Sequence, residues 1–370
     1  MSEPSQPPWV ELAEPGVVGL RDDGPALLDG IAKDLQVDDE WIVRTARTLT
    51  WWGEPTPITF TVDQPGLIQG DPTIKLTAAV TMAVEVTAAT SVVLAAVDEL
   101  NHLATVGAVV WLEEERRVEA VLTHYAYRGI EPITQLVTAF ALVLYGEAMS
   151  RAGWLAEQVG GTPGVPPHPV SGEREDFDEM MTFTADQVLP AGSVQNRWWG
   201  GELEGVAQYL SENEVGIAGG GDSSLTVEFP LARNDAERYT RLRSHHMSGG
   251  DAFTEDSIAE FFSMPTALEQ LMCVDHPHYG AGLTSLLRFP VRTRDDALAF
   301  ANDLNLGEYR GRTGFPAIGA WCADGDGVAH TAFMANYFHR DWVAPNLASW
   351  AAIRTRWAFE AMAPDLIERQ

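Results

Sequence analysis

The chain has 370 residues, of which 45% are apolar, and its 24 basic and 53 acidic side chains give a formal net charge of -29. Domains cluster near roughly 100 to 200 residues, so this length favours two domains of ordinary size. A surface this acidic repels phosphate backbones and anionic lipids, so we expect neither a nucleic-acid partner nor a membrane partner.

The cysteines and the N-terminus indicate a cytoplasmic protein. Only Cys273 and Cys322 occur, and so widely spaced a pair is more typical of reduced core residues than of a secreted disulfide framework. Residues 1–16 lack the basic region and apolar stretch of a signal peptide or an N-terminal anchor. The most apolar window, residues 77–97, contains Glu85 and several threonines and is too polar to span a bilayer.

Composition along the chain predicts four segments. Residues 1–40 combine proline, glycine and acids with a short helical stretch at 25–37 and are expected to form a loosely held arm. Residues 161–185 concentrate proline, glycine and charge, which is typical of an extended linker. The apolar patterns on either side of this linker predict a first lobe at 41–160 and a second lobe at 186–370.

The two lobes share one order of elements. In the first lobe, a strand pattern at 77–86 is followed by helical spacing at 91–101. In the second lobe, 282–291 is followed by 295–305, and both helical stretches end in Leu-Asn. This similarity indicates an internal repeat.

A hairpin and a closing helix follow in each lobe. The hairpin at 108–125 matches that at 318–337, whose Asp-Gly-Asp-Gly turn is a strong hairpin signal. The matched positions are Trp111 with Trp321 and Val118 with Val328. Each closing helix carries one apolar stripe. The sequence therefore predicts an α+β fold of two related lobes, each a small antiparallel sheet packed by helices.

The element order, and above all residues 314–362 with their Gly-Ala-Trp-Cys segment and Trp-rich closing helix, resembles the actinobacterial proteins with YbjN-like and type III secretion chaperone-like (TY-Chap) domains. The resemblance covers the second lobe from about Gly280 onward and reaches the first lobe through the repeat. It implies a small helix-packed antiparallel sheet and a function in binding other proteins. Secretion chaperones are usually short dimers, so the chain is expected to be either a monomer with an internal pseudo-dimer or a homodimer.

The candidate metal ligands are Cys273, His276 and His278, with His245 and His246 upstream. Thiolate and imidazole groups at short spacing can bind zinc. A structural zinc site usually needs a second clean ligand pair, which these residues lack. We therefore interpret them as loop histidines and a buried cysteine, and expect no metal and no other cofactor.

Adjacent carboxylates are the candidate general acids and bases. Glu113, Glu114 and Glu115, and likewise Asp324 and Asp326, fall at predicted hairpin tips. There they solvate a turn, whereas acid and base catalysis needs a carboxyl in an apolar pocket.

Glycine runs and nucleophile motifs complete the search for chemistry. The runs at 219–221 and 249–250 are followed by no Gly-Lys-Ser/Thr and match no G-x-G-x-x-G, so we interpret them as flexible turns. The sequence contains no G-x-S-x-G, and Cys322 lies within an apolar strand pattern. We expect the protein not to be an enzyme.

Twelve tryptophans are the strongest sign of an interface, because Trp buries a large area at small entropic cost. The candidate partner-binding residues are Trp51, Trp52, Trp198 and Trp199. Adjacent residues in a strand point to opposite faces of the sheet, so one tryptophan of each pair must point away from the core of its own lobe. The other lobe could still cover that side chain.

We therefore expect a non-enzymatic protein-binding or chaperone-like protein of the bacterial cytosol. One alternative is an enzyme or small-ligand binder with a site between the lobes, because such sites favour domain interfaces. Another alternative is a structural subunit of a larger assembly, which would display a broad apolar patch.

Overall fold

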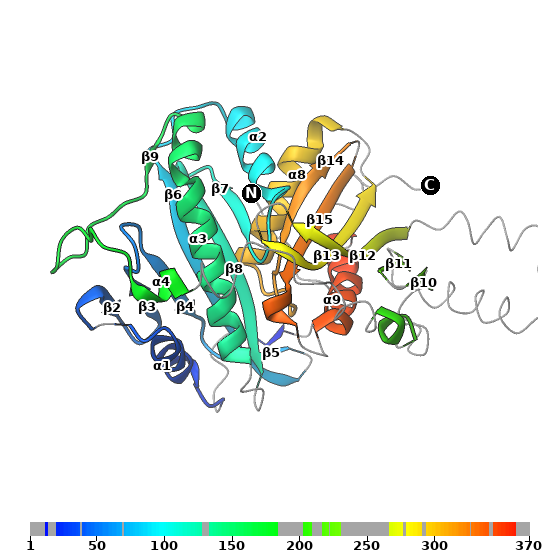
Figure 1. The fold of residues 1–370 in the computed structure, drawn as a ribbon, viewed down its shortest axis with the longest axis horizontal. Helices are drawn as coiled ribbons and strands as arrows, with labels where there is room; N and C mark the ends of the chain where they lie inside the picture. Colours follow the sequence, from blue (N-terminus) through cyan, green and yellow to red (C-terminus); the bar gives the residue numbers. More distant parts are fainter. Residues whose placement is uncertain are drawn as a thin grey trace, which may run out of the picture.

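The fold is given by a computed structural model, shown in Figure 1. It describes residues 12–13, 20–37, 39–68, 70–127, 133–183, 203–208, 217–221, 223–230, 266–276, 279–290, 294–325, 327–339 and 343–359. Over these ranges the chain forms two antiparallel sheets, one of nine strands and one of six, with helices packed against them. The predicted α+β fold with two sheet lobes is confirmed.

The first sheet is centred on the long strand β6. Its strands are β1 (Leu12–Ala13), β2 (Ile42–Arg44), β3 (Thr48–Trp51), β4 (Ile58–Val62), β5 (Gly66–Ile68), β6 (Asp71–Val84), β7 (Ala108–Leu112), β8 (Arg117–Tyr127) and β9 (Thr162–Pro163). The order across the sheet is β2-β3-β4-β6-β8-β7. The short strands β5 and β9 pair with β6 on the edge that it shares with β4, and β1 extends β5.

Alternation along these strands separates an inner face from an outer face. Phe60, Ala78 and Leu122 lie side by side on the inner face and are buried. The helices α1 (Gly24–Asp34), α2 (Thr90–Asn101) and α3 (Ile133–Val159) pack against the first sheet, and their apolar side chains complete its core.

The second sheet has the order β10-β11-β12-β13-β15-β14. Its strands are β10 (Ile217–Gly221), β11 (Ser224–Pro230), β12 (Thr266–His276), β13 (Gly280–Pro290), β14 (Ala320–Asp324) and β15 (Gly327–Ala335). Helices α8 (Arg294–Arg310) and α9 (Val343–Trp357) pack on its inner face. Shorter elements are η1 (Asp39–Trp41), α4 (Glu179–Phe183) and η3 (Asn336–Phe338).

The predicted N-terminal arm is in part built into the first lobe. Leu28 and Ile31 of α1, and Leu35 just after it, are fully buried. Their spacing places all three on one face of the helix, which packs against α3 and β4. The prediction of a loose arm is therefore wrong for residues 20–37, while residues 1–11 and 14–19 lie outside the described part.

The segment predicted as a linker also belongs to the first lobe over its described part, residues 161–183. Strand β9 pairs with β6, His168 is buried, and Arg174 forms an ion pair with Asp178 at 3.2 Å. Near the end of the segment, Met181 is buried as well. Its proline and glycine content predicts irregular backbone correctly, but composition does not show whether that backbone is packed.

The repeat predicted from sequence is present, with a correction to its alignment. Val118 pairs with Trp111, and Val328 pairs with Ala323. If the two valines are equivalent, then Trp111 corresponds to Ala323, and Trp321 lies two residues earlier in its strand. The matching of Trp111 with Trp321 is therefore wrong by two residues. The sequence pattern does not separate the two alignments, because a shift of two residues keeps every side chain on the same face of the sheet.

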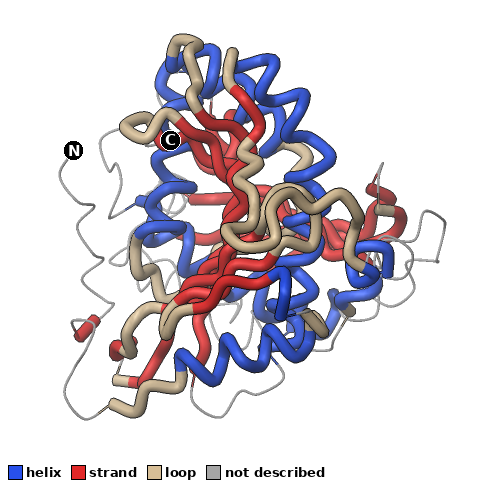
Figure 2. The backbone as a smooth tube through the Cα atoms, turned by 90° about the vertical axis from the view of Figure 1, so that its left-hand side faces the viewer, coloured by secondary structure: helices blue, strands red, loops and turns tan. Residues whose placement is uncertain are grey.

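Figure 2 shows the strands of both lobes running through the middle of the molecule, with helices on either side. Among the helices of the described residues, none has the length and apolar character needed to cross a membrane.

Candidate functional site

Trp51 and Trp52 are both buried, with 0% and 6% of their surface exposed. Trp51 lies on the inner face beside Tyr145, with ring centroids 5.8 Å apart. Trp52 follows β3 and donates from Nε1 to the carbonyl of Pro166 at 2.9 Å, while its ring lies edge-on to that of His168. The expectation that one of this pair is open to a partner is wrong, because the segment after α3 covers it.

Several other candidates from the sequence lie outside the described residues. They are Trp198, Trp199, His245, His246, His278, Asp326 and residues 249–250. Of the remaining metal candidates, Cys273 pairs with Leu283, and His276 stacks on the ring of Tyr279 at 4.8 Å. Because Cys273 and His276 are three positions apart in one strand, they face opposite sides of the sheet. Over the described ranges, no three His, Cys, Asp or Glu side chains gather closely enough to hold a metal.

The turn carboxylates lie where the sequence predicts them. Glu113, Glu114 and Glu115 are exposed in the β7–β8 turn, and Asp324 is exposed at the end of β14. Residues 219–221, however, form part of the edge strand β10 rather than a flexible turn. Backbone pairing with β11 needs no side chain, so a glycine run is able to join a sheet.

The lobes meet where α2 packs against α8 and where the edge strands β7 and β14 face each other. Figure 1 shows these four elements side by side at the centre of the molecule. One apolar cluster at this contact contains Ala108, Val110 and Leu112 of β7 with Ala320 of β14 and Leu306 of α8, and the main core is itself continuous between the lobes.

Each edge strand is capped by an asparagine of its own lobe. Asn101, at the end of α2, accepts from the N–H of Val109 at 2.7 Å and donates to its carbonyl at 2.9 Å. Asn305 of α8 does the same for Trp321, at 2.8 and 2.9 Å. The side-chain amide takes the place of a neighbouring strand, so it satisfies backbone groups that an edge strand leaves unpaired.

The residue one turn earlier in each helix reaches the strand of the other lobe. Asn302 of α8 accepts from the N–H of Trp111 at 2.9 Å and donates to its carbonyl at 3.3 Å. Asp98 of α2 accepts from the N–H of Ala323 at 2.6 Å. Four Asx side chains thus clamp two edge strands, and the cross-lobe contacts are reciprocal.

Two backbone hydrogen bonds join equivalent pairs of residues across the junction, with donor and acceptor exchanged. The N–H of Phe333 donates to Thr105 at 3.1 Å, and the N–H of Ala317 donates to Thr123 at 2.9 Å. Thr105 and Ala317 precede the first strand of their hairpins, and Thr123 and Phe333 lie at matching places in the second. Contacts in which i meets j and j meets i are the mark of a two-fold interface. The two lobes are therefore arranged like the subunits of a homodimer.

A lysine from the first lobe caps the last turn of α8. The Lys75 ammonium donates to the carbonyl of Tyr309 and, at 2.7 Å, to that of Gly311. Burial lowers the pKa of Lys75 to about 8, an effect that the charge of Asp63 opposes and that of Arg312 strengthens. A cation at a helix C-terminus satisfies the free carbonyls there, so this contact joins the lobes.

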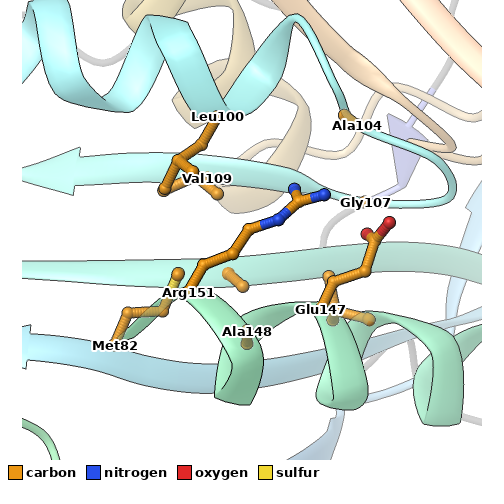
Figure 3. Close-up of a pocket in the computed structure, with 10 residues that line it drawn as sticks. Met82, Leu100, Ala104, Gly107, Val109, Glu147, Ala148 and Arg151 are labelled. Carbon is orange, nitrogen blue, oxygen red and sulfur yellow. The ribbon is translucent and has the colours of Figure 1, made fainter. Parts of the chain in front are cut away.

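Beside the junction lies a small pocket inside the first lobe. Figure 3 shows Glu147 and Arg151 extending from α3 toward the chain at Gly107, with Leu100 and Val109 on the opposite side of the pocket. Burial raises the pKa of Glu147, and a hydrogen bond with Tyr279 of the second lobe opposes this shift. The pocket has room for little more than one water molecule, so it is too small for an organic ligand.

The core of the second lobe contains a buried ion pair that the sequence analysis missed. Arg354 of α9 donates from Nε to Glu308 Oε1 at 2.8 Å, and both side chains are 4% exposed. The same carboxylate accepts from Trp321 Nε1 at 2.8 Å, and Arg354 also donates to the Pro316 carbonyl. The ionic groups are thus hydrogen-bonded as well as paired, which buried charges require.

A second buried carboxyl lies nearby on the inner face. Glu269 is fully buried and accepts from the Ser285 hydroxyl at 2.7 Å. Burial raises its pKa to about 8, against the effects of Ser285 and of Arg354. Alternation within β12 places Glu269 in phase with Leu271, but the opposite phase of this strand is equally apolar, so the sequence did not reveal its burial.

The outer face of the second sheet differs from this core. We call its half-exposed side chains the open sheet face, which consists of Leu268, Gln270, Met272 and Val274 of β12 with Thr284 and Leu286 of β13. Alternation places these six residues on one side, opposite the buried inner residues. This surface lies across two adjacent strands and mixes aliphatic with polar side chains, and the exposed Arg288 lies at its end, opposite Leu268 and bonded to Gln270.

The comparisons with known proteins identify no relative of this chain. Neither the protein-family models, nor the curated proteins, nor the solved structures contain a match to this chain.

Proposed function

We propose that the chain is a non-enzymatic, chaperone-like protein of the bacterial cytosol that binds a partner polypeptide on the open sheet face. The half-exposure of Leu268, Met272 and Leu286 on adjacent strands carries this proposal. Covering them would remove apolar area from water, which is the main favourable term in protein association. Methionine adapts its shape to different partners, which suits a chaperone-like surface.

The shape of the surface favours a polypeptide over a small molecule. Small ligands bind in concave pockets that enclose most of their area. The open sheet face follows two neighbouring strands, β12 and β13, and offers a broad contact of the kind that protein interfaces use. With a net charge of -29, the chain attracts a partner whose apolar segment is flanked by basic residues.

The junction of the lobes supports a monomer with an internal pseudo-dimer. Its reciprocal clamps occupy the polar edges of β7 and β14, the surfaces through which two separate subunits would pair. Lys75 and Asn302 are buried at this junction and bonded to the other lobe, which favours this reading over the alternative of an enzyme or small-ligand site between the lobes. The resemblance to TY-Chap proteins points in the same direction.

Affinity capture from the native cytosol tests this proposal, with the bound proteins identified and their binding then measured with purified components. The informative variants are Met272→Arg and Leu286→Arg on the open sheet face. Thr59→Arg is the matched control, because Thr59 is also half-exposed, on the outer face of the first sheet. We expect one stoichiometric partner with the wild type and the control, and its loss with both open-face variants.

Two outcomes would count against the proposal. If no partner is retained above background, or if Thr59→Arg loses it as well, the open sheet face is not the binding surface. If light scattering finds a homodimer that Leu286→Arg dissociates, the face serves a second copy of this chain, and a structural role in an assembly becomes the better explanation.

A further inference from the structure

Three of the four clamps at the lobe junction are amides, and the fourth is an acid. Asn101, Asn302 and Asn305 each accept from a strand N–H and donate to the carbonyl of the same residue. Asp98 occupies the fourth position, equivalent to Asn302, and accepts from the N–H of Ala323. An ionised carboxylate has no hydrogen to donate, so it has nothing to offer the carbonyl of Ala323.

That carbonyl faces the same edge as the N–H. In an antiparallel strand, the N–H and C=O of one residue point to the same side. Trp321, two residues earlier in β14, shows this geometry, because both of its backbone groups bond to Asn305. A protonated carboxyl at Asp98 would have one O–H donor and one acceptor, the same pair that an asparagine presents.

We propose that Asp98 makes the α2 side of the lobe junction a pH-responsive latch. With its carboxyl protonated, it holds both backbone groups of Ala323. With its carboxyl ionised, it holds the N–H alone and places a negative charge beside a carbonyl oxygen. The other cross-lobe clamp, through Asn302, stays closed at any pH.

The surroundings of Asp98 agree with a proton-linked role. Burial raises the pKa of Asp98, while the Ala323 N–H and the charge of His102 lower it. His102 Nδ1, one residue past the end of α2, lies 3.5 Å from Asp98 Oδ2. From β14, the Cys322 thiol faces this group, and burial together with the charges of Asp98 and Asp324 raises its pKa.

The sign of the effect follows from the raised pKa of Asp98. A group that binds its proton more tightly in the closed state adds stability at low pH, and that stability is lost as the pH rises through its folded-state pKa. Acid therefore tightens the latch, and a neutral or alkaline solution loosens it.

Amide hydrogen exchange of the whole chain, corrected for intrinsic rates, tests the proposal. In the wild type, we expect protection of β14 around Ala323 to fall as pH rises, by roughly two- to tenfold, the value of one hydrogen bond. Asp98→Asn should remove this dependence and keep β14 at or above the acid-side protection of the wild type. Asn302→Asp should transfer the same dependence to β7 around Trp111.

His102→Gln separates the acid from its neighbour. The proposal requires that the pH dependence of β14 persist in this variant. The proposal is overturned if β14 is less protected in Asp98→Asn than in the wild type at neutral pH, or if protection of β14 in the wild type does not depend on pH. It is also overturned if His102→Gln abolishes the pH dependence of β14 and Asp98→Asn does not. Should Asp98→Asn fold poorly, the Asn302→Asp result decides alone, because its dependence either appears at β7 or does not.

Discussion

The inner faces of the two sheets carry the same order of elements but bury different chemistry. In the first lobe, Phe60, Ala78 and Leu122 form an apolar row beneath α3. In the second lobe, the corresponding layer contains Glu269, and beside it the Glu308–Arg354 ion pair joins α8 to α9. A repeat in sequence therefore preserves strand pairing and helix position, while the groups that the pairing buries are free to diverge.

The largest expected effect is loss of the buried ion pair. Arg354→Leu leaves the Glu308 carboxylate buried without its partner, so we expect the free energy of unfolding to fall by about 3 to 5 kcal/mol. Chemical denaturation measures this change. Arg288→Leu is the control, since it breaks an exposed pair with Asp324 and should cost less than about 1 kcal/mol. Equal losses in the two variants would show that burial does not distinguish these pairs.

The second expected effect concerns the buried acid of the second lobe. The pKa of Glu269 is about 8 in the folded chain against an ordinary 4.5. Between these values the unfolded chain loses a proton that the folded chain keeps, so stability falls with rising pH by about 1.4 kcal/mol per unit. Glu269→Gln should therefore raise the free energy of unfolding by on the order of 2 to 3 kcal/mol near neutral pH.

The control for this variant is Glu114→Gln in the exposed β7–β8 turn, which should leave the curve of stability against pH unchanged. At a pH below the ordinary glutamate pKa, Glu269→Gln and the wild type should become equally stable. A variant that destabilises at every pH would contradict the assignment of Glu269 as a neutral buried acid.

The first lobe has its own buried titratable group. Both ring nitrogens of His124 are buried and find no hydrogen-bond partner among the described residues, and burial lowers its pKa from 6.5 to about 4. Between these values the unfolded chain binds a proton that the folded chain excludes, so stability falls as the solution becomes more acidic. His124→Leu should remove about 2 kcal/mol of this loss near pH 5.

Thermal unfolding across the acid range measures this effect. Glu269 and His124 would then respond to pH in opposite directions, since Glu269 penalises the alkaline side and His124 the acid side. An acid-side stability curve that His124→Leu leaves unchanged would remove His124 from that contrast.

The smallest expected effect compares clamps within and between the lobes. Asn101→Ala and Asn302→Ala each remove two hydrogen bonds from β7, at about 1 to 2 kcal/mol. Hydrogen exchange should locate the first loss at Val109 and the second at Trp111. Only Asn302→Ala should also increase amide exchange in α8. Increased exchange in α8 in both variants would show that the lobes do not open separately.

Part of the candidate site was predictable from local sequence signals. The turn acids Glu113, Glu114 and Glu115 were correctly assigned to an exposed hairpin tip, because turn residues between alternating strands are a short-range signal. The clamps were visible only as the shared Leu-Asn ending of two helices, which suggested a repeat and not a role. Trp52 was interpreted as an interface residue, since nothing in its own strand indicates that the chain more than a hundred residues later covers it.

By itself, the sequence determined the two lobes, their order of strands, helices and hairpins, and the α+β class, because alternation, helical spacing and turn chemistry act between near neighbours. Tertiary structure alone decided that the arm and the linker segment are packed, that Glu269 is buried, and that α2 and α8 exchange clamps across the junction. These features depend on contacts between residues far apart in the chain, and burial sets the energy of a charged or aromatic side chain more strongly than its residue type does.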